Sequence, residues 1–247
     1  MMQRSILCIY PADRQHELEI RGAHHCILGR MSRMRLLKKD LFGEIRLQNS
    51  AADFVIVRDT RSARWWLRWL ARLLLKREAS ALAALNGVDG VPQLIACDDE
   101  QLTRSYIGGT PMHLGKPRDR SYFVDAARLL RRMHRAGVVH NDLAKEPNLI
   151  VCDDGRAAFI DFQLAWHSMD RGRIFRIAAR EDIRHLLKHK RCYCPDQLTQ
   201  RERRIVDNPS GLSYVWMGLF KPIYLLVTRR LIGWSDREGA GERRHSI

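Results

Sequence analysis

The alternation of hydrophobic and polar positions first indicates a β-rich region with one helix. A strand pattern starts at Leu36, and residues 41–44 are typical of a turn between two strands. The β-branched run of residues 54–57 predicts another strand that ends at Arg58. Residues 64–85 then show helical spacing, stopped by Gly87 and Gly90, with apolar positions at Trp66, Trp69, Leu70, Leu73 and Leu74. Two further strands are predicted over residues 93–96 and 102–107.

After a Gly-Pro hinge at residues 108–111 the pattern is mostly helical. It predicts helices over residues 123–136, 180–190, 198–206 and 212–232. We interpret residues 1–33, which lack sustained periodicity, as a poorly ordered extension, and residues 236–247 as a loose tail. The domain organisation expected is therefore an N-lobe over residues 34–107 and a C-lobe over residues 108–235.

Composition narrows the class of protein. The 247 residues are 45% hydrophobic and 29% charged, which is typical of a globular chain. A net charge of +15 favours anionic partners: nucleotide phosphates, nucleic acid or an anionic membrane surface. Six scattered cysteines imply no disulfide framework, and we expect no signal peptide and no confident membrane span, since Lys221-Pro222 interrupts residues 212–226. We therefore expect a cytoplasmic protein, with peripheral contact at the inner face of the membrane as an option.

One polar constellation points to chemistry. His140, Asp142 and Asn148 are followed by Asp161-Phe162, after an apolar run, an Asp-Asp-Gly turn and a second apolar run. The Asp-Gly turn predicts a hairpin whose two ends, Asn148 and Asp161, lie at the same edge. Phosphoryl transfer from ATP needs a carboxylate to deprotonate a hydroxyl, and an amide and a carboxylate to hold Mg²⁺.

These motifs and the order of elements resemble the protein kinase superfamily over residues 36–165. The similarity is closest to the small atypical bacterial branch that includes RIO-type kinases and Kdo/lipopolysaccharide-core sugar kinases. The resemblance implies an α+β, two-lobed kinase-like fold that uses ATP and Mg²⁺. The roles it implies are Asp142 as the catalytic base, Lys145 as the cation that neutralises the transferred phosphoryl group, Asn148 and Asp161 as metal ligands, and Arg58, Glu78, Gly43, Tyr106 and Ile107 as the cofactor-binding set, with Arg58 and Glu78 forming an ion pair.

The sequence departs from the family pattern at several points. Asp142 and Asn148 are six positions apart rather than five, which predicts a bulge around residues 144–147. Arg58 stands where the family has lysine, and its planar fork reaches phosphate differently. Gln163 replaces glycine after Asp161-Phe162, which predicts a stiffer turn. No Ala-Pro-Glu element follows, which disfavours a standard activation segment and a protein-docking groove.

Two other groups of residues have alternative interpretations. His185, His189, Cys192 and Cys194 are a possible tetrahedral zinc set, although the surrounding lysines favour a basic helix end instead. Aromatic and basic residues around positions 65–70 and 214–230 suit a membrane interface, but for Trp66 and Trp69 we favour ordinary helix packing.

The sequence predicts a phosphotransferase that moves the γ-phosphoryl of Mg·ATP to a hydroxyl. The acceptor is either a protein Ser/Thr, for an atypical kinase, or a sugar or lipid-linked glycan. The alternative is a nucleotide-binding pseudokinase with a regulatory role. A nucleic-acid partner is disfavoured because no recognition motif is present.

Overall fold

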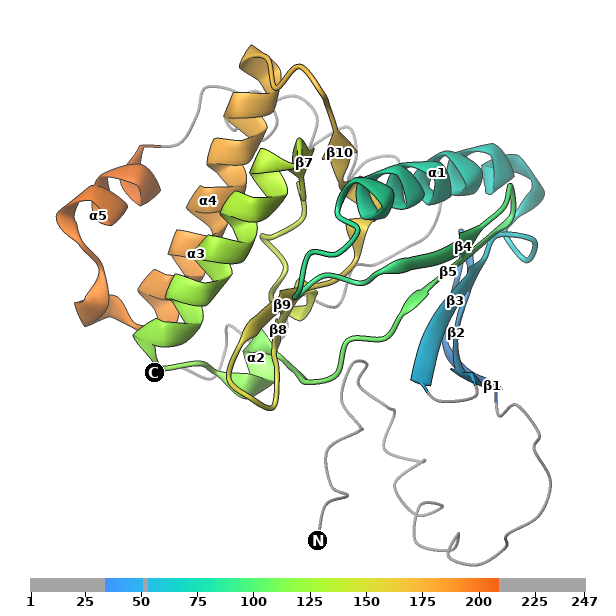
Figure 1. Ribbon diagram of the computed structural model, residues 1–247, viewed down its shortest axis with the longest axis horizontal. Helices are drawn as coiled ribbons and strands as arrows, with labels where there is room; N and C mark the ends of the chain where they lie inside the picture. Colours follow the sequence, from blue (N-terminus) through green and yellow to red (C-terminus); the bar gives the residue numbers. More distant parts are fainter. Residues whose placement is uncertain (1–33, 51–52, 209–247) are drawn as a thin grey trace, which may run out of the picture. The chain divides into compact units, whose positions relative to one another are not determined.

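The computed structural model describes residues 34–50 and 53–208 of the chain (Figure 1). Described residues up to Val206 belong to one compact unit, and a second unit begins at Asp207. The predictions for residues 1–33, 212–232 and 236–247 lie outside the described residues. The fold is α+β with two lobes, as predicted, because an antiparallel sheet with one helix precedes a mainly helical region.

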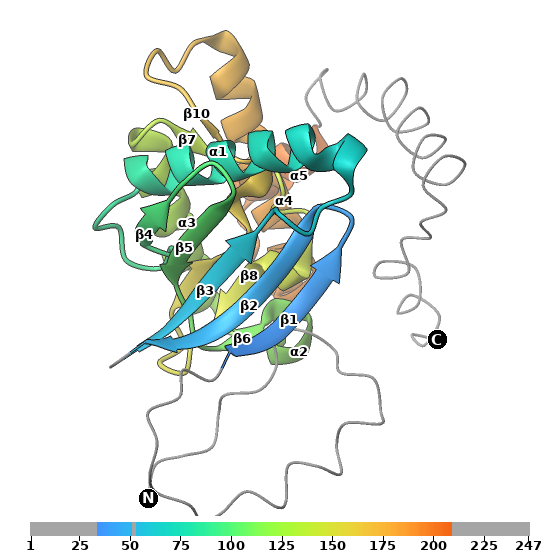
Figure 2. The same ribbon diagram turned by 90° about the vertical axis from the view of Figure 1, so that its right-hand side faces the viewer.

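Five antiparallel strands form the sheet in the order β1-β2-β3-β5-β4 (Figure 2). Central β3 pairs with β2 and β5 and buries the β-branched run Val55, Ile56 and Val57. Such side chains fill the half-buried surface of a pleated sheet well, so they form its middle. The strands are β1 (Met34–Asp40), β2 (Gly43–Ser50), β3 (Asp53–Asp59), β4 (Leu94–Cys97) and β5 (Gln101–Ser105).

Gly43 closes the turn between β1 and β2 against the end of β3. Its φ is +133°, and a Cβ at this position would lie 2.1 Å from the carbonyl oxygen of Asp59. A side chain would therefore be strained by the backbone angle and would also clash with the neighbouring strand. The turn sits close to β3 because residue 43 is glycine.

The helix α1 (Arg68–Ala84) follows a 3₁₀ turn, η1 (Trp65–Leu67), and contacts β4 and β5. Its buried positions recur at helical spacing and include Leu75, Glu78 and Leu82. Leu82 belongs to a core that continues into the helical region. The packing interpretation is wrong for Trp69, which is 66% exposed because it points away from this face. Trp66 is 38% exposed.

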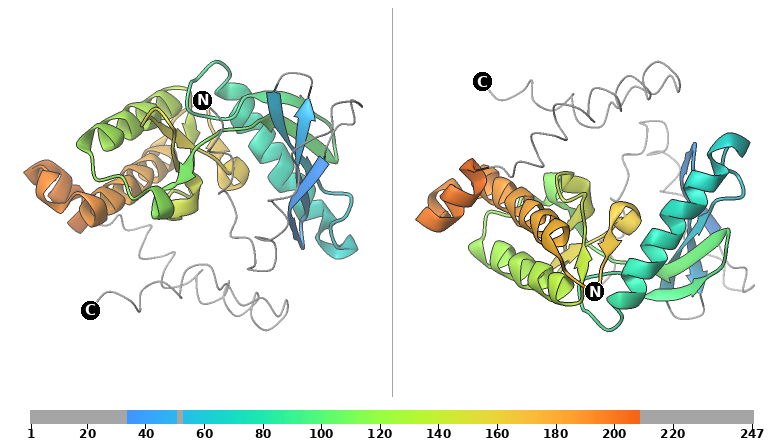
Figure 3. Two further views of the ribbon diagram at one scale, coloured as in Figure 1. Left: turned by 90° about the horizontal axis from the view of Figure 1, so that it is seen from below. Right: turned by 90° about the horizontal axis from the view of Figure 1, so that it is seen from above.

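The helical region places α3 and α4 side by side (Figures 1 and 3). Its helices are α2 (Met112–Gly115), α3 (Arg120–Arg135), α4 (Arg173–Tyr193) and α5 (Gln200–Asp207), with a 3₁₀ turn η4 (Pro195–Gln197). Short strands form two small sheets, β6 (Thr110–Pro111) with β8 (Leu149–Val151) and β9 (Ala157–Phe159), and β7 (Val138–Val139) with β10 (Trp166–His167).

The elements predicted within the described residues exist, and most differences concern their ends. α3 begins at Arg120 rather than residue 123, because the Asp119 side chain caps it by accepting a hydrogen bond from the Ser121 amide. α4 begins at Arg173 rather than residue 180, because arginines interrupt the apolar residues of its first turns and only Phe175 is buried there, which leaves a weak helical pattern. β3 continues past Arg58 to Asp59.

Candidate active site

Asp142 lies at the centre of a cluster of polar side chains that follows β7. Nδ2 of Asn148 lies 3.0 Å from Oδ2 of Asp142 and 2.9 Å from its backbone carbonyl oxygen, so the amide donates to both. Nζ of Lys145 lies 2.9 Å from the same Oδ2. Asp142 and Asn148 are buried, whereas Lys145 is exposed. Three residues of the predicted set therefore meet at one carboxylate.

The extra residue between Asp142 and Asn148 is absorbed by consecutive tight turns. The Lys145 amide lies 3.4 Å from the carbonyl oxygen of Asp142, and the Asn148 amide lies 3.1 Å from that of Lys145. The second turn is the 3₁₀ turn η2 (Glu146–Asn148), with Pro147 near its start, where a missing N–H costs little. The bulge thus lies within the predicted residues, and Asn148 still reaches Asp142.

Asp161 reaches the same place through the β8–β9 hairpin. Leu149 pairs with Phe159, and the Ile160 amide donates to the Asn148 carbonyl across 3.0 Å, so the two ends of the hairpin are adjacent. Asp161 has a left-handed backbone, with φ 66° and ψ 68°, which aspartate tolerates better than most residues. The 3₁₀ turn η3 (Phe162–Leu164), which contains Gln163, follows.

The protonation of Asp142 depends on these neighbours. Burial raises the pKa of Asp142 above the usual range for aspartate, and the Lys145 ammonium lowers it in part. The negative charge of Asp161 raises the pKa of Asp142 further. Asp142 and Asp161 are therefore close enough to interact electrostatically, and Lys145 makes the largest contribution in favour of the carboxylate form.

Asp182 on α4 anchors the loop that carries Asp142. Its Oδ2 accepts from the His140 amide across 2.7 Å, and its Oδ1 accepts from the Asn141 amide across 2.9 Å. Nε2 of His134 lies 3.3 Å from Oδ2 of the same residue. Asp182 is buried, and both of its oxygens are used. Sequence reasoning missed Asp182, because it lies next to Glu181 in a basic helix and no local feature tells the two acidic residues apart.

Two more residues of α4 hold the next part of the loop. Nε2 of His189 lies 2.8 Å from the carbonyl oxygen of Leu143, and the Tyr193 hydroxyl lies 2.7 Å from Oε2 of Glu146. Asp182, His189 and Tyr193 are seven and four positions apart, so they lie on one side of the helix. α4 therefore contacts the loop at several points.

The zinc interpretation is wrong for His185, His189, Cys192 and Cys194. His189 faces Leu143, Cys192 is exposed, and Sγ of Cys194 lies 3.7 Å from the Pro117 carbonyl oxygen. Among residues 34–50 and 53–208, no group of three or more His, Cys, Asp or Glu side chains could hold a metal. His185 and His189 share one side of α4, but Cys192 is exposed and Cys194 lies just after the helix ends, so the four side chains do not converge.

His140 supports the loop from within the core. It is fully buried, and its Nε2 lies 3.0 Å from the carbonyl oxygen of Ile160. Its ring lies 4.7 Å from that of Phe162, measured between centroids. These contacts fix the start of the loop against the end of the hairpin.

A buried carboxylate on α1 joins two arginines of the sheet. Nη1 of Arg58 lies 2.9 Å from Oε2 of Glu78, so the ion pair expected between them is present. Nε of Arg104, on β5, lies 3.1 Å from Oε1 of the same carboxylate. The exposed fractions of the Arg58, Glu78 and Arg104 side chains are 5%, 2% and 12%. Sequence reasoning missed Arg104, whose partner is set by the packing of α1 on the sheet.

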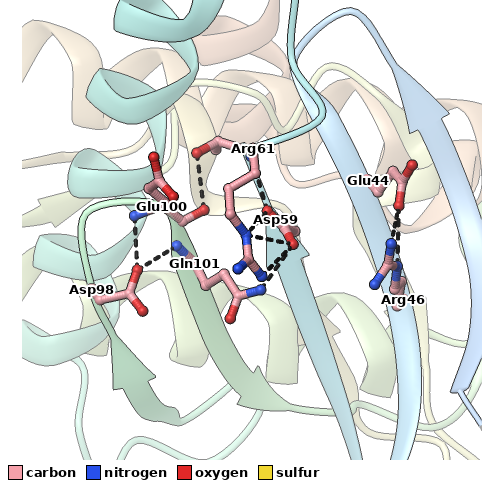
Figure 4. Close-up of polar contacts among 8 residues, drawn as sticks. Glu44, Arg46, Asp59, Arg61, Asp98, Glu100 and Gln101 are labelled. Carbon is pink, nitrogen blue, oxygen red and sulfur yellow. Dashed lines mark hydrogen bonds and ion pairs between the residues drawn. The ribbon is translucent and has the colours of Figure 1, made fainter.

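A network of polar contacts lies at the end of β3, beside the strand β2 (Figure 4). The Asp59 carboxylate accepts from the Arg61 guanidinium and backbone amide and from Nε2 of Gln101. Burial opposes the charge on Asp59, but the hydrogen bonds from Arg61 outweigh it and lower the pKa of Asp59 to about 2. Next to it, Glu44 pairs with Arg46 on β2 (Figure 4).

Tyr106 and Ile107 lie directly after β5, where the chain leaves the sheet. The Tyr106 amide donates to the Phe54 carbonyl across 3.1 Å, and the two rings meet edge to face. Both Tyr106 and Ile107 are half-buried. Arg58 lies opposite Leu102 near the start of β5, whereas Tyr106 and Ile107 follow the end of that strand. The predicted cofactor residues are therefore distributed along β5 rather than gathered at one end.

Comparison with known families agrees with this arrangement. The model of the RIO domain matches residues 48–201, which is more than half of the chain. The chain belongs to the RIO domain family. This family is atypical protein kinase-like, so the chain is a kinase-like protein, and ATP, Mg²⁺ and a hydroxyl acceptor are the ligands that the family implies in general. No curated protein matches the chain.

The donor set of this RIO domain fits a divalent cation. Because Nδ2 of Asn148 donates to Asp142, the oxygen of that amide is left to accept or to coordinate. The Asp161 carboxylate, at the other end of the hairpin, supplies a hard anionic oxygen of the kind that Mg²⁺ prefers.

Within the described ranges, none of the helices combines the length and the hydropathy needed to span a bilayer.

Proposed function

We propose that this RIO domain transfers the γ-phosphoryl of Mg·ATP to a hydroxyl group. The observation that carries the proposal is the meeting of Asn148 and Lys145 at the Asp142 carboxylate, with Asp161 beside it. Asp142 is the base that orients the acceptor hydroxyl and takes its proton. Lys145, which is exposed, offsets negative charge on the transferred group.

Asn148 and Asp161 are the proposed Mg²⁺ ligands. When bound, the cation neutralises phosphate charge and orients the transferred group. The chain's part is to hold both oxygen donors at one end of the β8–β9 hairpin, and to hold Asn148 by its amide nitrogen so that its oxygen stays directed away from Asp142.

Arg58, Glu78 and Gly43 are the proposed phosphate side of the nucleotide site, and Tyr106 and Ile107 the part next to the hinge. Arg58 and Arg104 share one carboxylate, so the group carries a surplus positive charge in a poorly hydrated place. A polyphosphate would balance that charge, and guanidinium groups bind phosphate oxygens well. Gly43 allows the β1–β2 turn to stay close to β3.

For the acceptor we favour a sugar or lipid-linked glycan over a protein side chain. Between Asp161 and the start of α4, the chain forms only η3, β10 and residues 168–172. This segment is short for a groove that would hold an extended peptide. Peripheral contact with an anionic membrane would bring a lipid-linked acceptor within reach of Asp142.

Transfer of labelled γ-phosphate into a fractionated cell extract tests the proposal, with the wild type beside Asp142→Ala. We expect label in the lipid or glycan fraction with the wild type only, and Mg·ATP binding in both proteins. Label in the protein fraction would assign a Ser/Thr kinase instead. Asp161→Asn should lose metal-dependent nucleotide binding.

If no fraction is labelled although Mg·ATP binds, the protein is a nucleotide-binding pseudokinase and the proposed transfer is wrong. If turnover persists in Asp142→Ala, the base is another residue. Unchanged Mg·ATP affinity in Asp161→Asn would reject Asp161 as a metal ligand.

A further inference from the structure

The outer face of η1 and α1 carries a line of exposed apolar side chains. Trp65 is 82% exposed, Trp69 66% and Leu73 48%. These three residues, which we name the tryptophan stripe, are four positions apart and so follow one side of the helix. Large apolar side chains that gather on a surface mark interaction sites more often than single exposed ones do.

The stripe points away from the nucleotide site. Glu78 follows Trp69 by nine positions, which is half a turn around an α-helix. Glu78 is buried against Arg58 and Arg104, while Trp69 is exposed. A partner can therefore cover the stripe without disturbing the buried ion pairs.

Basic residues run beside the stripe. Arg64, Arg68, Arg72 and Lys76 recur at every fourth position. Arg72 pairs with Glu100 and Lys76 with Asp99, so these two charges are largely offset. Arg64 and Arg68 have no acidic partner in the described part of the chain; a guanidinium nitrogen of Arg68 lies 3.4 Å from the Arg61 carbonyl oxygen. The unbalanced positive charge thus lies beside Trp65 and Trp69.

We propose that the tryptophan stripe, with Arg64 and Arg68, is a docking surface for an anionic phospholipid membrane. Tryptophan prefers the boundary between headgroups and acyl chains, and arginine is attracted to anionic headgroups. A helix whose exposed side is convex can lie in the plane of a bilayer with its apolar side inserted. A single nucleic-acid strand instead needs a basic groove lined by stacking platforms, which one convex helix does not form.

Vesicle sedimentation of the full chain tests the proposal. We expect binding to vesicles of phosphatidylcholine mixed with phosphatidylglycerol, and little binding to phosphatidylcholine alone. We expect two double variants each to weaken binding by about tenfold or more. Trp65→Ser with Trp69→Ser removes the apolar side chains that would insert. Arg64→Glu with Arg68→Glu removes the attraction to anionic headgroups, which is about 1 kcal/mol for each basic residue near the surface.

Two double variants are controls, because they replace large exposed apolar side chains by serine, or exposed arginines by glutamate, at positions elsewhere. They are Met169→Ser with Ile174→Ser, and Arg173→Glu with Arg176→Glu. Both should bind the anionic vesicles within about twofold of the wild type, because these positions are not part of the stripe and attraction to anionic headgroups acts only close to the surface. Mg·ATP affinity of all the variants should stay unchanged, because none of the substituted side chains contacts the nucleotide site.

Insertion of the tryptophan side chains into the acyl-chain region can be measured separately from binding. Brominated acyl chains should quench tryptophan fluorescence in the wild type. Trp65→Phe with Trp69→Phe should still bind but should lose much of that quenching, because phenylalanine keeps the apolar contact without the fluorophore. This variant also tests the proposal if the serine substitutions impair folding.

Three results would overturn the proposal. The first is equal binding to neutral and anionic vesicles. The second is vesicle binding that does not change when the stripe is substituted. If light scattering also shows that the wild type is a dimer and that the substitutions dissociate it, the stripe joins two copies of the chain instead. The third is no vesicle binding together with stripe-dependent binding of a single-stranded RNA.

Discussion

Nε of Arg104 lies 3.1 Å from Oε1 of Glu78, so the buried carboxylate of α1 is held from β5 as well as from β3. Each oxygen of Glu78 has its own guanidinium partner. These two contacts hold α1 against the sheet, and Arg77 of the same helix donates to the carbonyl oxygens of Leu164 and Ala165. Arg104 is therefore a positioning residue for the Arg58 side chain, and its loss can be measured.

Arg104→Leu should destabilise the protein by about 1–3 kcal/mol, because it removes a buried ion pair and leaves one oxygen of Glu78 without its cationic partner. We expect Mg·ATP affinity to fall several-fold as Arg58 loses its fixed position. Urea unfolding and calorimetric titration measure the two effects. Arg104→Lys should restore part of the affinity, and Arg46→Leu, which breaks a more exposed pair, should change stability by less than about 1 kcal/mol. Wild-type affinity in Arg104→Leu would show that Arg58 alone positions Glu78.

Asp182→Asn should cost roughly 2–3 kcal/mol, because an amide side chain has one accepting oxygen where the His140 and Asn141 amides need two. Turnover should fall far more than Mg·ATP affinity, since the β8–β9 hairpin still holds Asn148 and Asp161. Hydrogen exchange at residues 140–141 reports the loosened loop directly. The exposed residue Asp196 offers the control Asp196→Asn, which should leave exchange and turnover as in the wild type. Equal losses of affinity and turnover would contradict a role confined to the loop.

Asp59 should contribute stability that depends on pH. The pKa of Asp59 is lowered to about 2 in the folded protein, against about 3.9 in an unfolded chain. Its contribution, up to roughly 2 kcal/mol, is therefore fully present above pH 4 and is lost as the pH falls toward 2. Asp59→Asn should be less stable than the wild type at pH 7, and the gap should narrow below pH 4 in urea melts. Asp99→Asn, which breaks an exposed pair with Lys76, should show no such trend, and a gap independent of pH would argue against the Asp59 prediction.

Lys145 should set the acid limb of the pH–rate profile. A base must be ionised to act, and burial raises the pKa of Asp142 while Lys145 lowers it in part. Activity should therefore fall on acidification at a higher pH than for an ordinary aspartate. Lys145→Met should move that limb to still higher pH, because the nearby positive charge is lost, whereas Lys145→Arg should keep it in place. A limb that does not move would show that Asp142 is not the titrating base.

Much of the fold is visible in the local pattern of the chain. The β-branched run of β3, the helical spacing of α1 and the Asp-Gly hairpin each depend on neighbours a few positions away. The position of the cluster at Asp142 is predictable for the same reason. Asn148 lies one loop away, and a short hairpin necessarily brings Asp161 back to Asn148.

The ends of elements depend on features that periodicity does not contain. The Asp119 cap extends α3, and the first turns of α4, in which only Phe175 is buried, give too weak an apolar pattern to mark its start. The bulge predicted between Asp142 and Asn148 is present, but its form, two successive tight turns, depends on backbone hydrogen bonds.

By itself, the sequence determined the α+β order of elements, the kinase-like family and the spacing that gathers Asp142, Asn148 and Asp161, because chain geometry over short separations leaves few alternatives. Only the tertiary structure decided that Arg104 shares Glu78, that Asp182 holds the loop and that Trp69 faces outward. Each of these depends on the direction in which a side chain points once distant elements have packed. The residues concerned are separated by tens of positions, and local spacing carries no information about such contacts.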